Sequence, residues 1–511
     1  MPRFVLIATA LLGLPCSATG LETTPLPALA DLHLNPAPRS AAETARIKAV
    51  LAPPTQFDTP HRFEAMPAGA ATVPRTPGDA AFSQPSANLA HDAKMTFHLG
   101  DAMFAKLWVS SPSSTLASDG LGPLYNARSC QRCHVNDGRG HAPEGPEDDA
   151  TSMLLRLSVP AAQDDALPPI PGFHGDQPHP VYGGQLQDLG TPGQAGEYRL
   201  EVTYTEQSVT LPDGEVVQLR RPDYGLADLR YGPLGPEAKI SARVAPQMIG
   251  LGLLEAIPAA DILALADPQD ADGDGISGRP NIVWSTEFNQ PMLGRFGLKA
   301  GMPSLRAQVA DAFSGDIGIS SPLRPAPWGD CTAAQAACRD APHGDKDVRS
   351  FEIAADAMDL VVFYSRNLGV PARPDAGDPQ VLRGKAVFHA AGCAACHRPS
   401  FVTHRLPDQP AQSFQLIWPY TDLLLHDMGP GLADNRPEAR ATGREWRTPP
   451  LWGIGLTWKV SGHSQFLHDG RARSILEAIL WHGGEAERAR DRVARLPTED
   501  RNALIAFLES L

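Results

Sequence analysis

The chain has 511 residues, enough for two or three domains with cores of their own. Its 58 acidic and 44 basic residues give a formal net charge of −14. This charge argues against nucleic acid as a partner, because proteins that bind nucleic acid present a basic surface. An acidic surface is compatible with a basic redox partner, although net charge alone bears only on solubility and encounter.

Residues 1–20 have the pattern of a secretory signal peptide. Arg3 supplies a positive charge, residues 4–12 are apolar, and the small residues Ser17 and Ala18 follow. The apolar run is too short to cross a bilayer, and no later run is long enough. We therefore expect an exported, periplasmic protein with no membrane insertion.

Residues 21–90 are rich in Pro, Ala, Thr and Ser and show weak periodicity. This composition predicts an N-terminal arm that is either wrapped over the first domain or partly disordered. A helix is expected next, because Phe97, Gly100, Phe104 and Leu107 recur at helical spacing.

Two short strings carry the strongest chemical signal. Cys130-Gln131-Arg132-Cys133-His134 and Cys393-Ala394-Ala395-Cys396-His397 are both C-x-x-C-H, the pattern that attaches a c-type haem. The two cysteines bind the two vinyl groups of one porphyrin, and the histidine is the proximal iron ligand. A zinc site or a pair of redox dithiols would also use C-x-x-C pairs, but neither requires the histidine. The chain is therefore predicted to hold two covalently bound c-type haems.

The remaining cysteines are consistent with export. Of seven cysteines, Cys16 lies in the predicted signal peptide and four belong to the haem motifs, which leaves Cys331 and Cys338. In an oxidising compartment, two cysteines seven positions apart most simply form a local disulfide. A free-thiol or redox role is the alternative.

A β-hairpin is predicted within the first haem domain. Residues 198–204 and 215–219 favour strands, and Pro212-Asp213-Gly214 between them is a turn signal. The hairpin is an insertion in a domain that we place at residues 91–260.

Residues 270–276 resemble the start of a calcium loop. Asp270, Asp272 and Asp274 occupy positions one, three and five, and the carbonyl of Ile276 would serve at position seven. Position twelve is Asn281 in place of the glutamate of an EF-hand, which indicates a structural calcium site. The alternative is a solvated acidic turn. The loop and the cysteine pair lie in a connector at 261–349.

A second haem domain is expected at residues 350–511. It has helical patterns at 357–368 and 381–388, before the second motif, and an apolar stripe of Leu504, Phe507, Leu508 and Leu511. These are the parts of a cytochrome-c-like domain. The fold class is therefore predicted as mainly α, with two cytochrome-c-like haem domains, a β-hairpin insertion and a calcium loop between the domains.

His482 is a candidate ligand to the second haem. Ser474 and Glu477 form a capping-box pattern, and the helix that begins there ends at Gly483 and Gly484. His482 shares one face of this helix with apolar residues such as Ile479. A histidine in that position is more often a core residue than a ligand.

At this point the chain resembles the bacterial di-haem cytochrome c peroxidase superfamily. It has Thr448-Pro449-Pro450-Leu451 and Phe466-Leu467-His468-Asp469-Gly470, and the axial position of the second haem in that superfamily lies fourteen residues past His468, at His482. The resemblance thus implies that His482 is the sixth ligand, where the peroxidases have methionine. Ligation by two histidines would lower the reduction potential relative to a His/Met site.

The closer resemblance is to the branch called di-haem oxidoreductases or thiol oxidoreductases, over about residues 95–511. It rests on the strings Asn126–Cys130, Tyr182–Leu186, Gly250–Glu255, Asp272–Asn281, Gly294–Gly297, Tyr420–Gly429, Trp446–Thr448 and Trp481–Ala486. In the superfamily the N-terminal haem activates peroxide beside a Gln and a Glu, which implies Gln185 and Glu197 here as catalytic residues. His426 and Met428 are further candidates to ligate or line the second haem, and Arg295 and Arg447 are candidates to pair with haem propionates.

The resemblance implies a periplasmic, peroxidase-like di-haem oxidoreductase. Its C-terminal haem would take electrons from a small cytochrome or cupredoxin and feed a reactive N-terminal haem, whose oxidant would be a small molecule such as hydrogen peroxide. A non-enzymatic electron carrier and a dioxygen-activating di-haem oxygenase are the two alternatives. The leftover cysteine pair gives thiol oxidation little support.

Overall fold

A computed structural model describes residues 29–511, except 116, 146–147, 149–150, 163–164 and 345–349. The predicted signal peptide, residues 1–20, lies outside the described residues. Within the described part of the chain, no helix is both long enough and apolar enough to cross a membrane.

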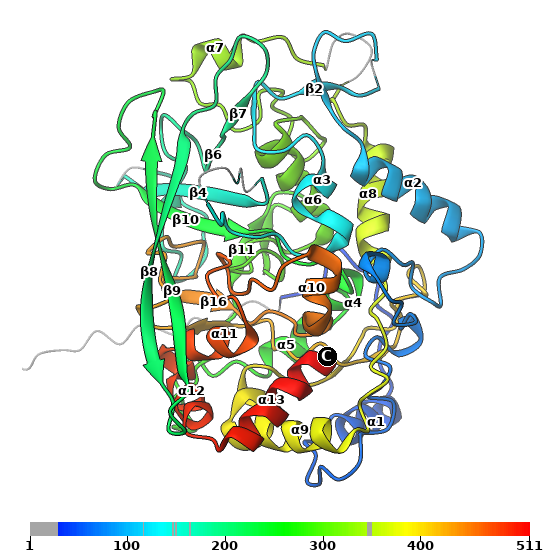
Figure 1. Ribbon diagram of the computed structural model, residues 1–511. Helices are drawn as coiled ribbons and strands as arrows, with labels where there is room; N and C mark the ends of the chain where they lie inside the picture. The colour runs from blue at the N-terminus through cyan, green and yellow to red at the C-terminus, as the bar shows by residue number, and fades with distance from the viewer. Residues whose placement is uncertain (1–28, 116, 146–147, 149–150, 163–164, 345–349) are drawn as a thin grey trace, which may run out of the picture.

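The longest helices pack in two pairs. α2 (Ala93–Ala105) lies against α8 (Ala355–Asn367), and α9 (Pro379–Ala391) lies against α13 (Thr498–Ser510) (Figure 1). α2 and α9 are the helices that the sequence predicts before each C-x-x-C-H motif. The other helices are α1 (Ala41–Val50), α3 (Cys130–Cys133), α4 (Leu251–Glu255), α5 (Ala259–Leu263), α6 (Leu305–Ala312), α7 (Ala336–Arg339), α10 (Thr457–Ser461), α11 (Ile475–Trp481) and α12 (Glu487–Ala494).

Single helical turns link several of these helices. One of them, η4 (Phe313–Ile317), is a π-helical turn that continues α6. The others are 3-10 turns: η1 (Gly69–Ala71), η2 (Asp79–Ala81), η3 (Val135–Asp137), η5 (Cys393–Ala395), η6 (Ile454–Leu456) and η7 (Gly484–Ala486).

The prediction of a mainly α protein is wrong, because 28% of the structure is helical and 18% is strand. The chain has 46 glycines and 50 prolines, and both residue types disfavour helices. Many segments between the helices instead form short two-stranded sheets. One sheet joins β4 (Met153–Pro160) to β5 (Asp176–Gln177), β6 (Gln185–Leu186) and β10 (Lys239–Val244). The two-stranded sheets pair β1 (Val109–Ser110) with β2 (Asp119–Leu121), β3 (Leu124–Tyr125) with β7 (Leu189–Gly190), β11 (Ile282–Ser285) with β12 (Gln290–Leu293), β13 (Phe401–Val402) with β14 (Leu416–Ile417), and β15 (Leu425–Asp427) with β16 (Glu445–Arg447).

The predicted β-hairpin is present as β8 (Arg199–Thr210) and β9 (Val216–Ala227), which pair antiparallel along their full length. It extends along the side of the molecule to α12 and α13 (Figure 1). At its tip, Asp213 and Glu215 both bind the guanidinium of Arg501 on α13. An insertion in the first half of the sequence is therefore anchored on the second half.

The arm, as far as it is described, is also tied to distant parts of the chain. Asp31 forms a buried ion pair with Arg295, and Glu64 forms buried ion pairs with Lys385 and Arg373. These contacts hold the arm against Arg295, against Arg373 and against Lys385 on α9. The predicted domain boundaries stay a prediction.

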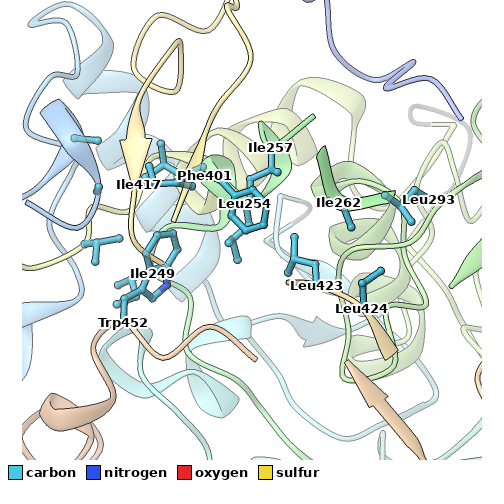
Figure 2. Close-up of a cluster of buried hydrophobic side chains, with 14 of the residues drawn as sticks. Ile249, Leu254, Ile257, Ile262, Leu293, Phe401, Ile417, Leu423, Leu424 and Trp452 are labelled. Atoms are coloured by element: carbon cyan, nitrogen blue, oxygen red, sulfur yellow. The ribbon is translucent and has the colours of Figure 1, made fainter. Parts of the chain in front are cut away.

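One hydrophobic cluster joins both halves of the chain. Figure 2 shows Ile249, Leu254 and Ile262 packed with side chains from later segments, which include Phe401, Leu423 and Trp452. Burial of this apolar surface holds segments from the two halves of the chain together.

Candidate haem-binding site

Both C-x-x-C-H motifs line one cavity of about 740 Å³, a size typical of ligand sites. Cys130, Cys133 and His134 lie on its wall, and so do Cys393, Cys396 and His397. The rest of the wall is largely apolar and includes Phe104, Leu305, Val361, Phe388 and Leu504.

Each motif histidine is oriented for iron. His134 Nδ1 lies 2.8 Å from the carbonyl oxygen of Pro246, and His397 Nδ1 lies 3.0 Å from that of Tyr420. Because Nδ1 donates its hydrogen to a carbonyl, the proton is on Nδ1 and Nε2 carries the lone pair that can bind a metal. Metal-binding histidines generally have this arrangement. Burial lowers the pKa of both imidazoles to about 4, so both are neutral.

The geometry disfavours zinc. Among the described residues, the only group of three or more His, Cys, Asp or Glu side chains whose ligand atoms converge within 4.8 Å is Asp267, Asp270 and Asp272. The four motif cysteines do not meet, and none of them is in a disulfide. Cys331 and Cys338 do form the predicted disulfide.

His482 has the same arrangement as the two proximal histidines. It follows α11, whose N-terminus is capped by Ser474, and its Nδ1 lies 2.7 Å from the carbonyl oxygen of Ala478. The ring lines the cavity, and burial lowers its pKa. His482 is therefore a neutral imidazole with Nε2 free on the cavity that holds the second motif.

His426 lines the same cavity but has no nitrogen free. Its Nε2 lies 2.8 Å from Asp422 and its Nδ1 lies 2.7 Å from Glu485. Burial opposes it, but the Asp422 carboxylate, with a further contribution from Cys396, holds the pKa of His426 well above its usual value. His426 is therefore a buried cation in the wall, beside Met428.

Two guanidinium groups on the cavity wall suit haem propionates. Arg139 and Arg447 have no carboxylate within ion-pair distance among the described residues; they donate to backbone carbonyls of Leu467 and of Gly297 and Thr448. Burial lowers the pKa of both to about 10. Arg295 differs, because its partner is Asp31. Neutral histidines, free thiols and unpaired guanidinium groups together fit two c-type haems.

A titratable carboxyl group and a guanidinium group lie near the first motif. Asp316, on the π-helical turn η4, lines the cavity, and its backbone oxygen accepts hydrogen bonds from the amides of Asn126 and Ala127, just before Cys130. Burial raises the pKa of Asp316 to about 6, although Arg156 opposes the shift. Arg156 also lines the cavity and is 3.3 Å from Asp311.

Gln185 and Glu197, the predicted catalytic residues, lie behind this wall. Gln185 pairs with Arg156 in the β4–β6 register, and its Nε2 donates to Asp316 Oδ1 at 2.9 Å. Glu197 is fully buried and accepts hydrogen bonds from the Gln187 amide and from Gln335. Neither side chain lines the cavity.

The predicted calcium loop brings three carboxylates together, but they are not the predicted three. The carboxylates that converge are those of Asp267, Asp270 and Asp272, while Asp274 accepts a 2.8 Å hydrogen bond from the Ile276 amide. Asn281 is fully buried and donates to the carbonyl oxygen of Lys299, so it is not available to the loop. Calcium stays a prediction.

The family is settled by a family model that matches residues 64–511 and is described as "Di-haem oxidoreductase, putative peroxidase". The chain belongs to the di-haem oxidoreductase family. No curated protein matches it. Among solved structures it is similar to hydrazine synthase from Kuenenia stuttgartiensis, with a TM-score of 0.23, 18% identity, and coverage of 37% of this chain and 65% of that chain.

Sequence reasoning missed several residues of this di-haem oxidoreductase. Asp316 and Arg156 sit in strings without a recognisable motif, and only the folded chain brings them to Cys130. His468 lines the cavity and stacks on Trp446 with the ring centroids 3.9 Å apart, and in the sequence its string indicates only the position of His482. The Arg139 side chain could have been suspected from its position five residues after His134.

Proposed function

We propose that this protein is a periplasmic di-haem oxidoreductase that reduces hydrogen peroxide with electrons from a small cytochrome or cupredoxin. Haem would supply the redox chemistry at two inequivalent positions, an electron-accepting one held by His397 and His482 and a reactive one held by His134. The observation that carries the proposal is that difference. The imidazole of His482 lines the cavity close enough to His397 to affect its pKa, whereas the Asp316 carboxyl and the Arg156 guanidinium lie near the N-terminal motif.

Asp316 has the properties of a general acid–base. Its pKa of about 6 leaves both protonation states populated near neutral pH, the condition under which such a group is most effective. We assign it the proton transfer from one peroxide oxygen to the other. Arg156 stabilises the negative charge that develops on the departing oxygen. Reduction of hydrogen peroxide to two waters takes two electrons, from the redox-protein donor, and two protons from solvent.

Gln185 then acts on the acid. By donating to Asp316, it holds the carboxyl in one orientation and favours its ionised form. Gln185 would thus position Asp316 and would not itself contact peroxide.

The experiment is turnover of hydrogen peroxide by the haem-loaded protein with a reduced cytochrome as donor. We expect turnover in the wild type and a loss of about 10²- to 10⁴-fold in kcat/KM in Asp316→Asn. Asp408→Asn, at an exposed carboxylate, is the matched control. A wild type that consumes no peroxide and shows two low-spin ferric signals by EPR would contradict the proposal and favour an electron carrier. A stable dioxygen complex of the first haem would favour an oxygenase.

A further inference from the structure

A second, smaller cavity of about 90 Å³ lies beside the second haem motif. The arm forms one side of it, through Val50–Pro54 and His61. The other side consists of His389 on α9, Ala394 within the motif, and Arg398 and Trp418 after it. This cavity is separate from the large one that holds the motif cysteines.

Its polar lining includes two buried ring nitrogens that have no hydrogen-bond partner among the described residues. Trp418 is 4% exposed, and its Nε1 has no hydrogen-bond partner among the described residues. His389 Nε2 is likewise buried without a partner. A buried indole N–H with no acceptor destabilises the folded protein unless a bound molecule accepts its hydrogen bond.

The cavity also carries positive charge without a balancing carboxylate. Within the part of the chain that the structure describes, Arg398 donates only to the Leu51 carbonyl oxygen, at 3.3 Å. Lys385 lines the cavity too, but its partner Glu64 is shared with Arg373. Among the described residues, no Asp or Glu lines the cavity. Glu64 thus pairs with two cations, and Arg398 has no carboxylate partner in the described part of the chain.

We propose that this cavity binds a small inorganic oxyanion, with the Arg398 guanidinium and the Trp418 Nε1–H as its principal donors. The volume holds an anion of four or five heavy atoms and excludes an organic ligand of nucleotide size. An anion supplies the missing acceptor and the missing negative charge together. Nothing in the peroxidase proposal uses this cavity.

Occupancy by an anion has a consequence for the neighbouring iron. Negative charge beside Ala394 stabilises the more positive, ferric state of the haem attached to Cys393 and Cys396 and lowers its reduction potential. This consequence rests on the proposed function, because it requires a haem at the second motif. The binding site itself does not.

The test is calorimetric titration of the haem-loaded full chain with inorganic phosphate, and separately with nitrate, at constant ionic strength. We expect saturable binding of one anion per chain. Arg398→Gln should weaken it by about 10- to 100-fold, and Trp418→Phe by about tenfold, since hydrogen bonds to charged groups are among the stronger ones. Arg46→Gln, at an exposed arginine of α1 in the same arm, should bind as the wild type does.

Circular dichroism and the haem absorbance of each variant show whether it is folded. Absence of saturable binding of either anion to the wild type would overturn the proposal and leave a water-filled cavity. Equal binding by folded Arg398→Gln would overturn it as well, because the anion would then bind elsewhere.

Redox titration of the second haem with and without the anion tests the coupling. A lower potential in the wild type and no shift in Arg398→Gln is the expected result; binding without a shift would overturn the coupling. Failure of peroxide turnover would contradict only the proposed function, since anion binding is measured without peroxide.

Discussion

Gln185 Nε2 lies 2.9 Å from Asp316 Oδ1, although the two residues are 131 positions apart in the sequence. Gln185 is on strand β6, and Asp316 is on the π-helical turn η4. The family resemblance indicates the glutamine as a catalytic residue, but it does not indicate the acid to which this glutamine is hydrogen-bonded. The residue that faces the cavity is the acid, so the chemistry expected of the glutamine depends on its neighbour.

Gln185→Leu removes a hydrogen bond that lowers the pKa of Asp316, and that pKa should therefore rise above about 6. The ionised form then becomes scarcer at any given acidic pH, and the rise of kcat/KM with pH should move to higher pH. We expect a loss of about tenfold below pH 6 and a smaller loss at high pH. The pH profile of peroxide reduction measures this. Gln218→Leu, on the exposed face of β9, is the control; a uniform loss at all pH values would contradict the positioning role.

His482→Ala should remove the sixth ligand of the second haem. The low-spin ferric signal of that haem in EPR should give way to a high-spin signal or to a water-ligated form. His482→Met should keep the iron six-coordinate and raise its reduction potential, because methionine ligation favours the ferrous state. His98→Ala, at an exposed histidine, should change neither signal nor potential. An unchanged spectrum in His482→Ala would assign the ligand to another residue.

Glu197 should make stability depend on pH. Burial raises its pKa from 4.5 to about 8, so the folded state holds a proton that the unfolded state has already released between these values. The contribution of this proton to the free energy of unfolding is complete below pH 4.5. It is lost as pH rises to about 8, by up to about 1.4 kcal/mol per pH unit. Denaturant unfolding at several pH values should show this fall in the wild type and a flatter curve in Glu197→Gln. Glu201→Gln, on exposed β8, should follow the wild type; parallel curves for Glu197→Gln and the wild type would exclude the linkage.

Calcium should stabilise the protein through the loop at 267–272. A concentration 100 times the Kd would add about 2.7 kcal/mol to the free energy of unfolding. Asp267→Asn and Asp270→Asn should abolish this response, whereas Asp274→Asn should reduce it less, since Asp274 lies outside the converging group. Thermal unfolding with calcium and with a chelator provides the measurement. An equal response in Asp270→Asn would place the ion elsewhere or show binding to be nonspecific.

Local signals in the sequence predicted the local features well. Fixed spacing defines the two haem motifs, the Pro212-Asp213-Gly214 turn defines the hairpin, and proximity along the chain defines the disulfide between Cys331 and Cys338. Each depends on residues a few positions apart. The helices before the motifs were accessible for the same reason, through apolar periodicity.

Features built from distant residues were not accessible in this way. The strand content was underestimated because most strands are only two to four residues long and leave no alternating pattern. Asp316 approaches the first motif through backbone hydrogen bonds to Asn126 and Ala127, which no local pattern announces. The shared cavity likewise results from packing of segments from both halves.

The contacts of the arm have a consequence for the order of assembly. Asp31 meets Arg295 and Glu64 meets Lys385 across 264 and 321 positions, so the arm is synthesised long before its partners. Contacts between such distant positions are slow to form, because a long loop must close first. We therefore expect the arm to dock late in folding, after the segments that carry Arg295 and Lys385 have folded. The small cavity between the arm and Trp418 then forms only in that last step.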